Sequence, residues 1–293
     1  MEYYQTARKC FDDYVSSFNE SDISKLIEQK RMHTNEVVID GIKTIKKLNF
    51  NESFIDFTKI ALMNHDVGRF LQARVTKTFN DIELHKFCFE NHGELGTYVL
   101  KSGLINSQIP ITRNFDGPIL SIVNNHVTKV INPKQLLILS SNLLKNEDAL
   151  DFFSTASTEE KQKVIDTITQ IVQDVDRLDI YHQIIDGRWN PIKSKDKISN
   201  IVLNQFYDGK YLNIAKLRKE GLWNSNVGEL VRLTFINQIR LLSVAQIIKE
   251  EKILEKMRRK QNNRQVIEAY DFTIDKLNVL IKESNGIIVW HLF

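Results

Sequence analysis

The sequence has few of the residues that interrupt helices. It contains 4 prolines and 11 glycines in 293 residues, and no proline follows Pro191. Proline breaks a helix interior and glycine weakens it, so this scarcity, together with long stretches of helical apolar spacing, predicts a mostly helical chain. The length suffices for one large domain or two small ones with a sizeable core. We therefore expect an all-α fold.

Cysteine, net charge and long apolar runs are also scarce. Two cysteines provide neither a disulfide framework nor a metal knuckle, which favours a reducing compartment. The 40 basic and 37 acidic residues leave a net charge of +3, which gives no reason to expect binding to nucleic acid or to a membrane surface. No apolar run approaches the ~20 residues of a membrane span, and the first residues lack the layout of a signal peptide. We expect a soluble, cytoplasmic protein.

Several common catalytic motifs are missing. The chain has no Gly-x-Ser-x-Gly elbow, no Gly-x-x-x-x-Gly-Lys loop and no dinucleotide fingerprint. It does have histidines that continue the apolar faces of separate candidate helices, as His65 does four residues after Ala61. A histidine buried in this way needs a partner. Four residues share this pattern: His33, His65, His92 and His126.

A candidate helix from 157 to about 185 adds carboxylates. Asp176 and Asp179 each follow an inward valine by four residues, which predicts that both face the core and that Asp174 does not. A buried aspartate is costly unless it is paired, hydrogen-bonded or bound to a metal. Imidazole and carboxylate are common ligands of Mn, Fe and Zn, so a metal is the simplest explanation for the whole set. The remaining histidines are expected to be ordinary core or surface residues: His85, His182 and His291.

The order of these residues resembles the HD-domain metal-dependent phosphohydrolases. Residues 64–70 (NHDVGRF) look like the family's L-H-D-I-G-R/K segment. Residues 92–96 (HGELG) are similar to its H-a-x-x-G helix, and residues 174–179 (DVDRLD) to its D-A-D-k-L-D helix. The resemblance covers roughly residues 22–190. It implies an HD-domain/phosphodiesterase-like helical bundle.

The resemblance also implies a domain layout and a ligand set. Residues 1–190 would form the catalytic domain, and residues 191–293 a helical C-terminal extension, either packed on it or continuous with it. Two divalent metal ions (Mn, Fe, Mg, Ni or Zn) would share Asp66 as a bridge, and Asp176 is favoured over Asp179, a choice that helical spacing leaves open. The expected ligands of the first ion are His33, His65, Asp66 and Asp176, and those of the second are Asp66, His92 and His126.

The activity implied by the resemblance is hydrolysis of a phosphate ester or anhydride by a metal-activated water. The expected substrate is a small phosphorylated molecule such as a nucleotide. Asp66, Arg69 and Asp179 are the expected catalytic residues. Polar residues after the His-Asp pair are expected to bind the substrate phosphate, although each could equally lie on a solvated face: Arg69, Gln72, Arg74 and Lys77.

Two other functions stay open. A di-iron site on the same scaffold supports oxygenase chemistry, and a non-catalytic module could keep the pocket to sense a nucleotide. The Gly-Tyr-Pro signature of the cyclic-di-nucleotide branch and the acidic pair of the alarmone hydrolases are absent, and Arg69 stands where lysine is frequent. These departures argue against those two substrates. The C-terminal third has no cluster of titratable residues on an apolar face, and we expect it to serve packing or a homodimer surface.

Overall fold

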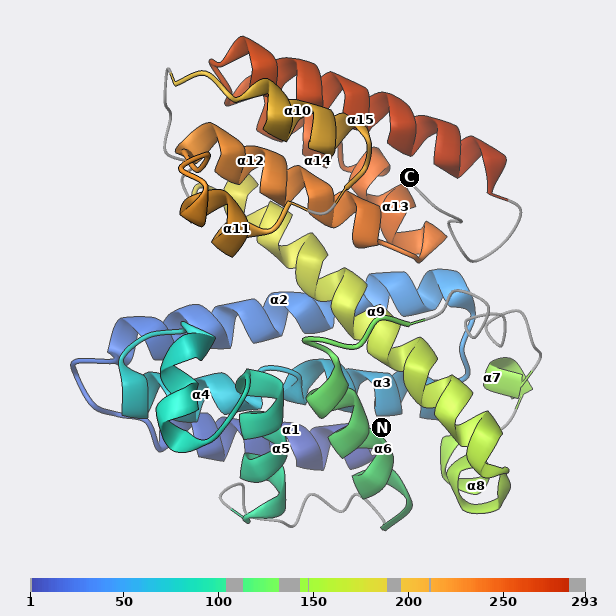
Figure 1. Cartoon of the computed structure of the whole chain (residues 1–293). Coiled ribbons are helices and arrows are strands. Elements are labelled where there is room, and N and C mark those ends of the chain that lie inside the picture. Colours follow the sequence, from blue (N-terminus) through green and yellow to red (C-terminus); the bar gives the residue numbers. More distant parts are fainter. Residues whose placement is uncertain are drawn as a thin grey trace. The chain divides into compact units, whose positions relative to one another are not determined.

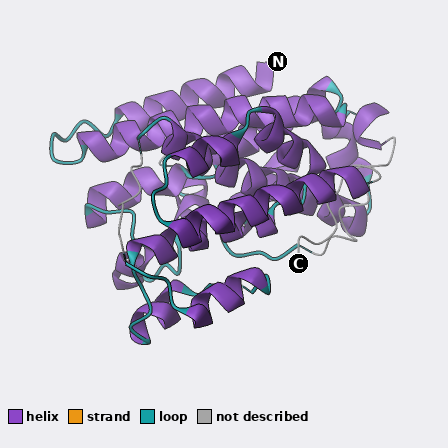
Figure 2. Cartoon of the chain, turned by 90° about the horizontal axis from the view of Figure 1, so that it is seen from above, coloured by secondary structure: helices purple, strands orange, loops and turns teal. Residues whose placement is uncertain are grey.

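The fold is entirely helical. The computed structural model describes residues 2–103, 113–131, 143–146, 148–188, 196–210 and 212–284. Within these ranges the regular elements are α-helices and short 3₁₀ helices without any strand, which confirms the predicted all-α class (Figure 1 and Figure 2). None of the described helices combines the length and apolar character that crossing a membrane requires.

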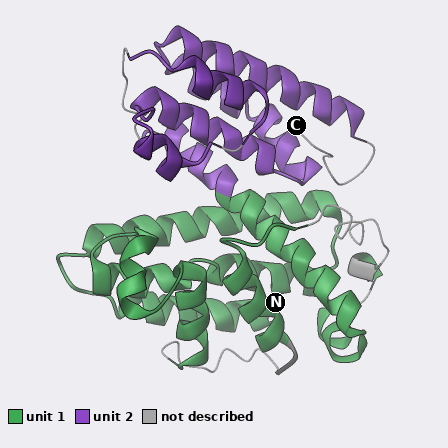
Figure 3. Cartoon of the chain, viewed as in Figure 1, with its two compact units in different colours: residues 1–176 green, residues 177–293 purple. Residues whose placement is uncertain are grey.

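The chain forms two compact units, residues 1–176 and 177–293 (Figure 3). The division falls inside the long helix α9 (Thr158–Ile185), whereas the sequence predicts a boundary at residue 190, after this helix. The last turns of α9 belong to the second unit, where the Tyr181 hydroxyl donates a hydrogen bond of 2.9 Å to the Arg232 carbonyl. A boundary within a continuous helix leaves no loop or proline to mark it in the sequence.

The first unit is built around α3. Its helices are α1 (Glu2–Ser16), α2 (Ser24–Leu48), α3 (Glu52–Asn64), α4 (Val67–Thr76), the 3₁₀ helix η1 (Asp81–Phe87), α5 (His92–Lys101), α6 (Arg113–Asn125), α7 (Leu143–Asn146), α8 (Ala149–Thr155) and most of α9. Helix α3 packs against α1, α2 and α6, which explains why Phe54, Phe57 and Ile60 are completely buried (Figure 1). Burial of α3 on several sides carries the His-Asp pair at its C-terminal end into the interior.

Two glycines allow α4, α5 and α6 to approach closely. A Cβ atom on Gly68 would lie 2.5 Å from the His92 carbonyl oxygen, and one on Gly93 would lie 2.7 Å from the Val123 carbonyl oxygen. Real Cβ atoms do not approach backbone this closely, so both contacts require glycine. Gly68 lies in the first turn of α4, where it allows close packing against α5.

The second unit consists of the last turns of α9 and a group of shorter helices. They are α10 (Asn200–Tyr207), α11 (Ile214–Lys219), α12 (Ser225–Thr234), the 3₁₀ helix η3 (Phe235–Gln238), α13 (Leu242–Glu250), α14 (Ile253–Arg259) and α15 (Arg264–Glu283). Helix α15 packs against α12, α13 and α14. Contrary to the prediction, this unit buries titratable groups: Glu229 is 2% exposed, pairs with Arg232 and accepts a hydrogen bond from Tyr270. Burial raises the pKa of this carboxyl, which indicates a packed internal network.

Candidate metal centre

Six of the residues predicted from the sequence lie together in the first unit. Five are buried, and Asp176, on α9, has a side chain that is 32% exposed. They come from five different parts of the fold, because each sits at the inward end or face of its own helix. His33 lies on α2, His65 and Asp66 join α3 to α4, His92 begins α5, His126 follows α6 and Asp176 lies on α9.

The two carboxylate oxygens of Asp66 face different histidines. Oδ2 lies 3.2 Å from His33 Nε2 and 3.6 Å from His65 Nε2. Oδ1 lies 3.3 Å from His92 Nε2 and 3.9 Å from His126 Nε2. Asp66 therefore belongs to two groups of three candidate ligands, and in each group the ligand atoms lie within 4.8 Å of one another. These buried groups could hold metal ions.

Asp176 lies beside the first of these groups. Its Oδ1 atom is 3.1 Å from His33 Nε2 and 3.7 Å from His65 Nε2. Ligand atoms that share one ion, each at a bond length of about 2.1 Å, are separated by roughly 3.0 to 3.5 Å. The separations among Asp176, His33 and His65 are close to that range. The first group can therefore offer two imidazoles and two carboxylates to one ion.

Three of the rings are oriented by a hydrogen bond at Nδ1. His65 Nδ1 lies 2.6 Å from the Leu62 carbonyl oxygen, and His126 Nδ1 lies 2.7 Å from the Val123 carbonyl oxygen. His92 Nδ1 lies 2.8 Å from Asp81 Oδ2. Carbonyls and carboxylates only accept, so Nδ1 carries the proton and Nε2 presents a lone pair to the cluster.

His126 provides the clearest sign that this cluster suits a cation. Its Nε2 atom is buried and has no hydrogen-bond partner among the described residues. A buried polar atom of this kind is normally satisfied, and leaving it unpaired is unfavourable. A divalent ion would satisfy this lone pair, and imidazole and carboxylate match the preferences of Mn, Fe and Zn. The donor set therefore fits a metal.

The protonation states at neutral pH are those of metal ligands. Burial, followed by the neighbouring His92 and His65, lowers the pKa of His126 to about 3. Burial also lowers the pKa of His92, against the opposing effect of the hydrogen bond that its Nδ1–H donates to Asp81. Burial alone would raise the pKa of Asp66, but the charge of Lys30 and the neighbouring histidines outweigh it and hold that pKa well below its usual range.

The carboxylate of Asp176 behaves in the same way. Burial would raise its pKa, but a hydrogen bond from His33 and the neighbouring His65 hold that pKa well below its usual range. Both carboxylates of the cluster are therefore ionised at neutral pH, and His126 is neutral. Metal ions bind these forms of the two side chains, because a ligand atom must be free of its proton.

Lys30 is a member of the cluster that sequence reasoning missed. Its Nζ atom lies 2.6 Å from Asp66 Oδ2. Lys30 precedes His33 by three residues on α2, so helical spacing places both on one side of the helix and could have indicated this contact. Arg69 Nε lies 3.6 Å from the other oxygen, Asp66 Oδ1. Two cations therefore flank the Asp66 carboxylate.

Arg69 and Gln72, two predicted substrate ligands, lie beside the cluster in a shared network. Arg69 Nη1 donates to Gln72 Oε1 at 2.8 Å, to the Phe79 carbonyl at 2.7 Å and to Asp81 Oδ1 at 2.7 Å. Gln72 Nε2 donates to the same Asp81 oxygen at 3.3 Å. Both side chains thus hold the segment after α4, and Arg69 also contributes charge near Asp66.

Arg74 and Lys77, the other two predicted substrate ligands, contact the segment between α1 and α2. Arg74 Nε lies 2.6 Å from Glu20 Oε1, and its guanidinium lies over the Phe18 ring at 4.1 Å. Lys77 pairs with Asp22 at 2.8 Å. The structure does not bring either residue to the cluster. Arg69 and Gln72 are three residues apart on one face of α4, and Arg74 lies on another face.

The predicted orientation of the aspartates on α9 is partly wrong. Asp174, predicted to face outward, is completely buried and accepts a hydrogen bond of 2.7 Å from Gln170 Nε2. Asp179, one of the three predicted catalytic residues, belongs to the second unit and accepts a hydrogen bond from Gln183 on the same helix. Helix α9 is buried on most of its circumference, so helical spacing from two valines does not separate its buried face from its exposed one.

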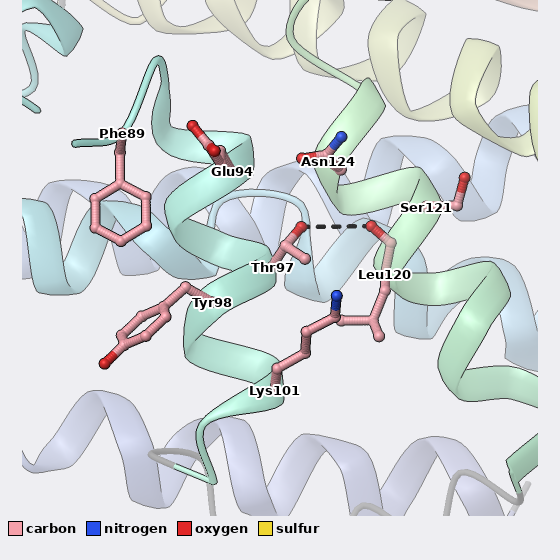
Figure 4. Close-up of a pocket in the computed structure, with 8 residues that line it drawn as sticks. All are labelled: Phe89, Glu94, Thr97, Tyr98, Lys101, Leu120, Ser121 and Asn124. Carbon is pink, nitrogen blue, oxygen red and sulfur yellow. Dashed lines mark hydrogen bonds between the residues drawn. The ribbon is translucent and has the colours of Figure 1, made fainter. Parts of the chain in front are cut away.

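A cavity of about 510 Å³ lies between α5 and α6 (Figure 4). Glu94, Tyr98 and Lys101 line it from α5, and Ser121 and Asn124 from α6. Among the described residues, none of the six candidate ligands contributes to its lining. The cavity is therefore separate from the candidate metal centre.

No family model, curated protein or solved structure matches this chain. The functional inference consequently depends on the chemistry of the site itself.

Proposed function

We propose that this protein is a metal-dependent phosphohydrolase of the HD-domain type. It hydrolyses a phosphate ester or anhydride of a small substrate such as a nucleotide. The observation that supports the proposal most strongly is the arrangement around Asp66, whose two oxygens each face a different pair of histidines. A carboxylate shared in this way is suited to link two metal positions, which is a common arrangement in phosphate-hydrolysing sites.

The residues of the cluster divide into two ligand groups. The first comprises His33, His65, Asp66 and Asp176, and the second comprises Asp66, His92 and His126. The chemistry supplied by two divalent ions in such a site is activation of a water and neutralisation of phosphate oxygens. The chain contributes unprotonated Nε2 atoms, held in place by the hydrogen bonds at the Nδ1 atoms of His65, His92 and His126.

Lys30 and Arg69 supply the positive charge of the chain closest to Asp66. Lys30 Nζ is 2.6 Å from Asp66 Oδ2, and Arg69 Nε is 3.6 Å from Asp66 Oδ1. Cations at these positions attract an anionic substrate and offset charge that develops on a phosphoryl group. Lys30 therefore takes the substrate-binding role that the sequence assigns to Arg74 and Lys77.

A metal add-back experiment with a substrate panel tests the proposal. Chelator-treated protein is supplied with Mn, Fe, Zn, Ni or Mg ions and assayed with phosphomonoesters, phosphodiesters and nucleotides. We expect metal-dependent hydrolysis that Asp66→Asn abolishes. Asp56→Asn, which alters a buried aspartate that pairs with Lys59 on α3, is the matched control and should retain activity.

Three outcomes would contradict the proposal. Hydrolysis that persists in Asp66→Asn would show that the proposed metal centre does not take part in the reaction. Oxygen consumption by iron-loaded protein without phosphate release would indicate an oxygenase. Tight nucleotide binding without turnover under any of the five ions would indicate a sensing module.

A further inference from the structure

Asp81 contacts the metal centre from outside the set of predicted ligands. It is the first residue of η1, and its two oxygens have different partners. Oδ2 lies 2.8 Å from His92 Nδ1, while Oδ1 accepts hydrogen bonds from Arg69 Nη1 and Gln72 Nε2. We propose that Asp81 is the positioning residue of the second metal position and holds His92 in the tautomer that leaves Nε2 free to bind an ion. This inference rests on the proposed metal centre.

His92 needs such a residue because of its place in its helix. His65 and His126 each follow a helix, and each places its Nδ1 proton on the backbone carbonyl three residues earlier, that of Leu62 or Val123. His92 is instead the first residue of α5, so the residue three positions before it, Phe89, lies outside the helix. The ring cannot use a carbonyl of its own helix, and a side chain from another segment takes that role.

The position of Asp81 is itself held by neighbouring residues. Arg69 bonds both to Asp81 Oδ1 and to the carbonyl of Phe79, two residues earlier in the chain. Asn80 caps η1, because its side chain accepts a hydrogen bond from the Ile82 amide at 3.2 Å. Side chains from α4 and a helix cap thus fix the carboxylate that orients His92. A carboxylate hydrogen-bonded to a ligand histidine in this way sets both the tautomer and the ring orientation.

The carboxylate is required because both of its sides face donors. An asparagine at position 81 has one acceptor oxygen and one NH₂ group, which must meet either the Arg69 side or the His92 side. Arg69 has no acceptor, but His92 can accept at Nδ1 if its proton moves to Nε2. Asp81→Asn should therefore change the tautomer of His92 and remove the Nε2 lone pair from the cluster.

The tautomer can be measured directly in metal-free protein. Two-bond ¹H–¹⁵N correlation spectra of ¹⁵N-histidine-labelled protein distinguish the two forms, and His92→Gln assigns the resonances. We expect the Nδ1–H form in wild type and the Nε2–H form in Asp81→Asn. Glu83→Gln is the matched control, because Glu83 lies on the same 3₁₀ helix and pairs with Lys86 on its exposed side. It should keep the wild-type tautomer.

Mn²⁺ binding provides the second readout. Equilibrium dialysis of Mn²⁺ against wild type should give two ions per chain. Asp81→Asn should keep the first ion with unchanged affinity and bind the second about 10- to 100-fold more weakly, the usual effect of losing a residue that orients a ligand. Glu83→Gln should bind both ions as wild type does.

The outcomes separate this inference from the proposed function. If His92 in the wild-type protein has the Nε2–H form, the proposed role of Asp81 is overturned. Unchanged binding of two ions by folded Asp81→Asn would overturn that role as well. Wild-type protein that binds no Mn²⁺ would instead overturn the metal centre. The tautomer measurement on metal-free protein reports on Asp81 in either case.

Discussion

Acid should destabilise the metal-free protein through His126. Burial, and then the neighbouring His92 and His65, lower the pKa of this imidazole to about 3. In the unfolded chain the same group titrates near pH 6.5. As the pH falls below about 6.5, the unfolded state binds a proton that the folded state does not, so stability is lost progressively until the folded pKa of about 3 is reached.

The size of this effect follows from the two pKa values of His126. A folded pKa of about 3 and an unfolded value of about 6.5 lower the free energy of unfolding by about 2 kcal/mol between about pH 8 and about pH 5. Glutamine stays neutral over this range. His126→Gln should therefore lose about 2 kcal/mol less than wild type over the same interval.

Urea unfolding of chelator-treated protein at the two pH values measures this difference. His85→Gln is the matched control, because His85 lies exposed on η1, outside the cluster. It should lose as much stability as wild type. Equal losses of unfolding free energy in wild type and His126→Gln would show that the buried ring does not oppose protonation.

Further substitutions test the packing and the charges around the candidate metal centre. Gly68→Ala places a Cβ 2.5 Å from backbone of α5 and should lower the free energy of unfolding by about 1–3 kcal/mol. Arg74→Ala should cost about 1 kcal/mol of stability and leave metal content and hydrolysis unchanged, since its contacts are to the α1–α2 segment. Lys30→Met removes a cation 2.6 Å from Asp66, so Mn²⁺ should bind more tightly in calorimetry while kcat/KM falls.

The helical fold and the main residues of the cluster could be predicted because their signals are local. Scarce proline allows long helices, and an apolar face that continues into a histidine indicates that the ring points inward. His65 and His126 illustrate this, since each ends or follows a helix whose apolar face is buried. The identity of the bound ion and its substrate stay predictions.

The remaining features depend on contacts between segments that lie far apart in the sequence. Arg74 contacts Glu20 and Phe18 because the segment between α1 and α2 lies beside α4, which helical spacing alone does not reveal. Asp81 is eleven positions before His92, at the start of η1, a 3₁₀ helix too short for a periodic pattern to indicate the direction of a side chain. Helical spacing predicts the wrong side for Asp174 because α9 is buried on most of its circumference. In each case tertiary packing determines the outcome.

Anomalous diffraction from crystals grown with Mn²⁺ can show whether Asp66 links two metal positions. We expect two anomalous peaks, one on each side of the Asp66 carboxylate. The first should lie among Asp66 Oδ2, His33, His65 and Asp176, and the second among Asp66 Oδ1, His92 and His126. Crystals with full Mn²⁺ access and no anomalous peak at Asp66 would contradict this expectation.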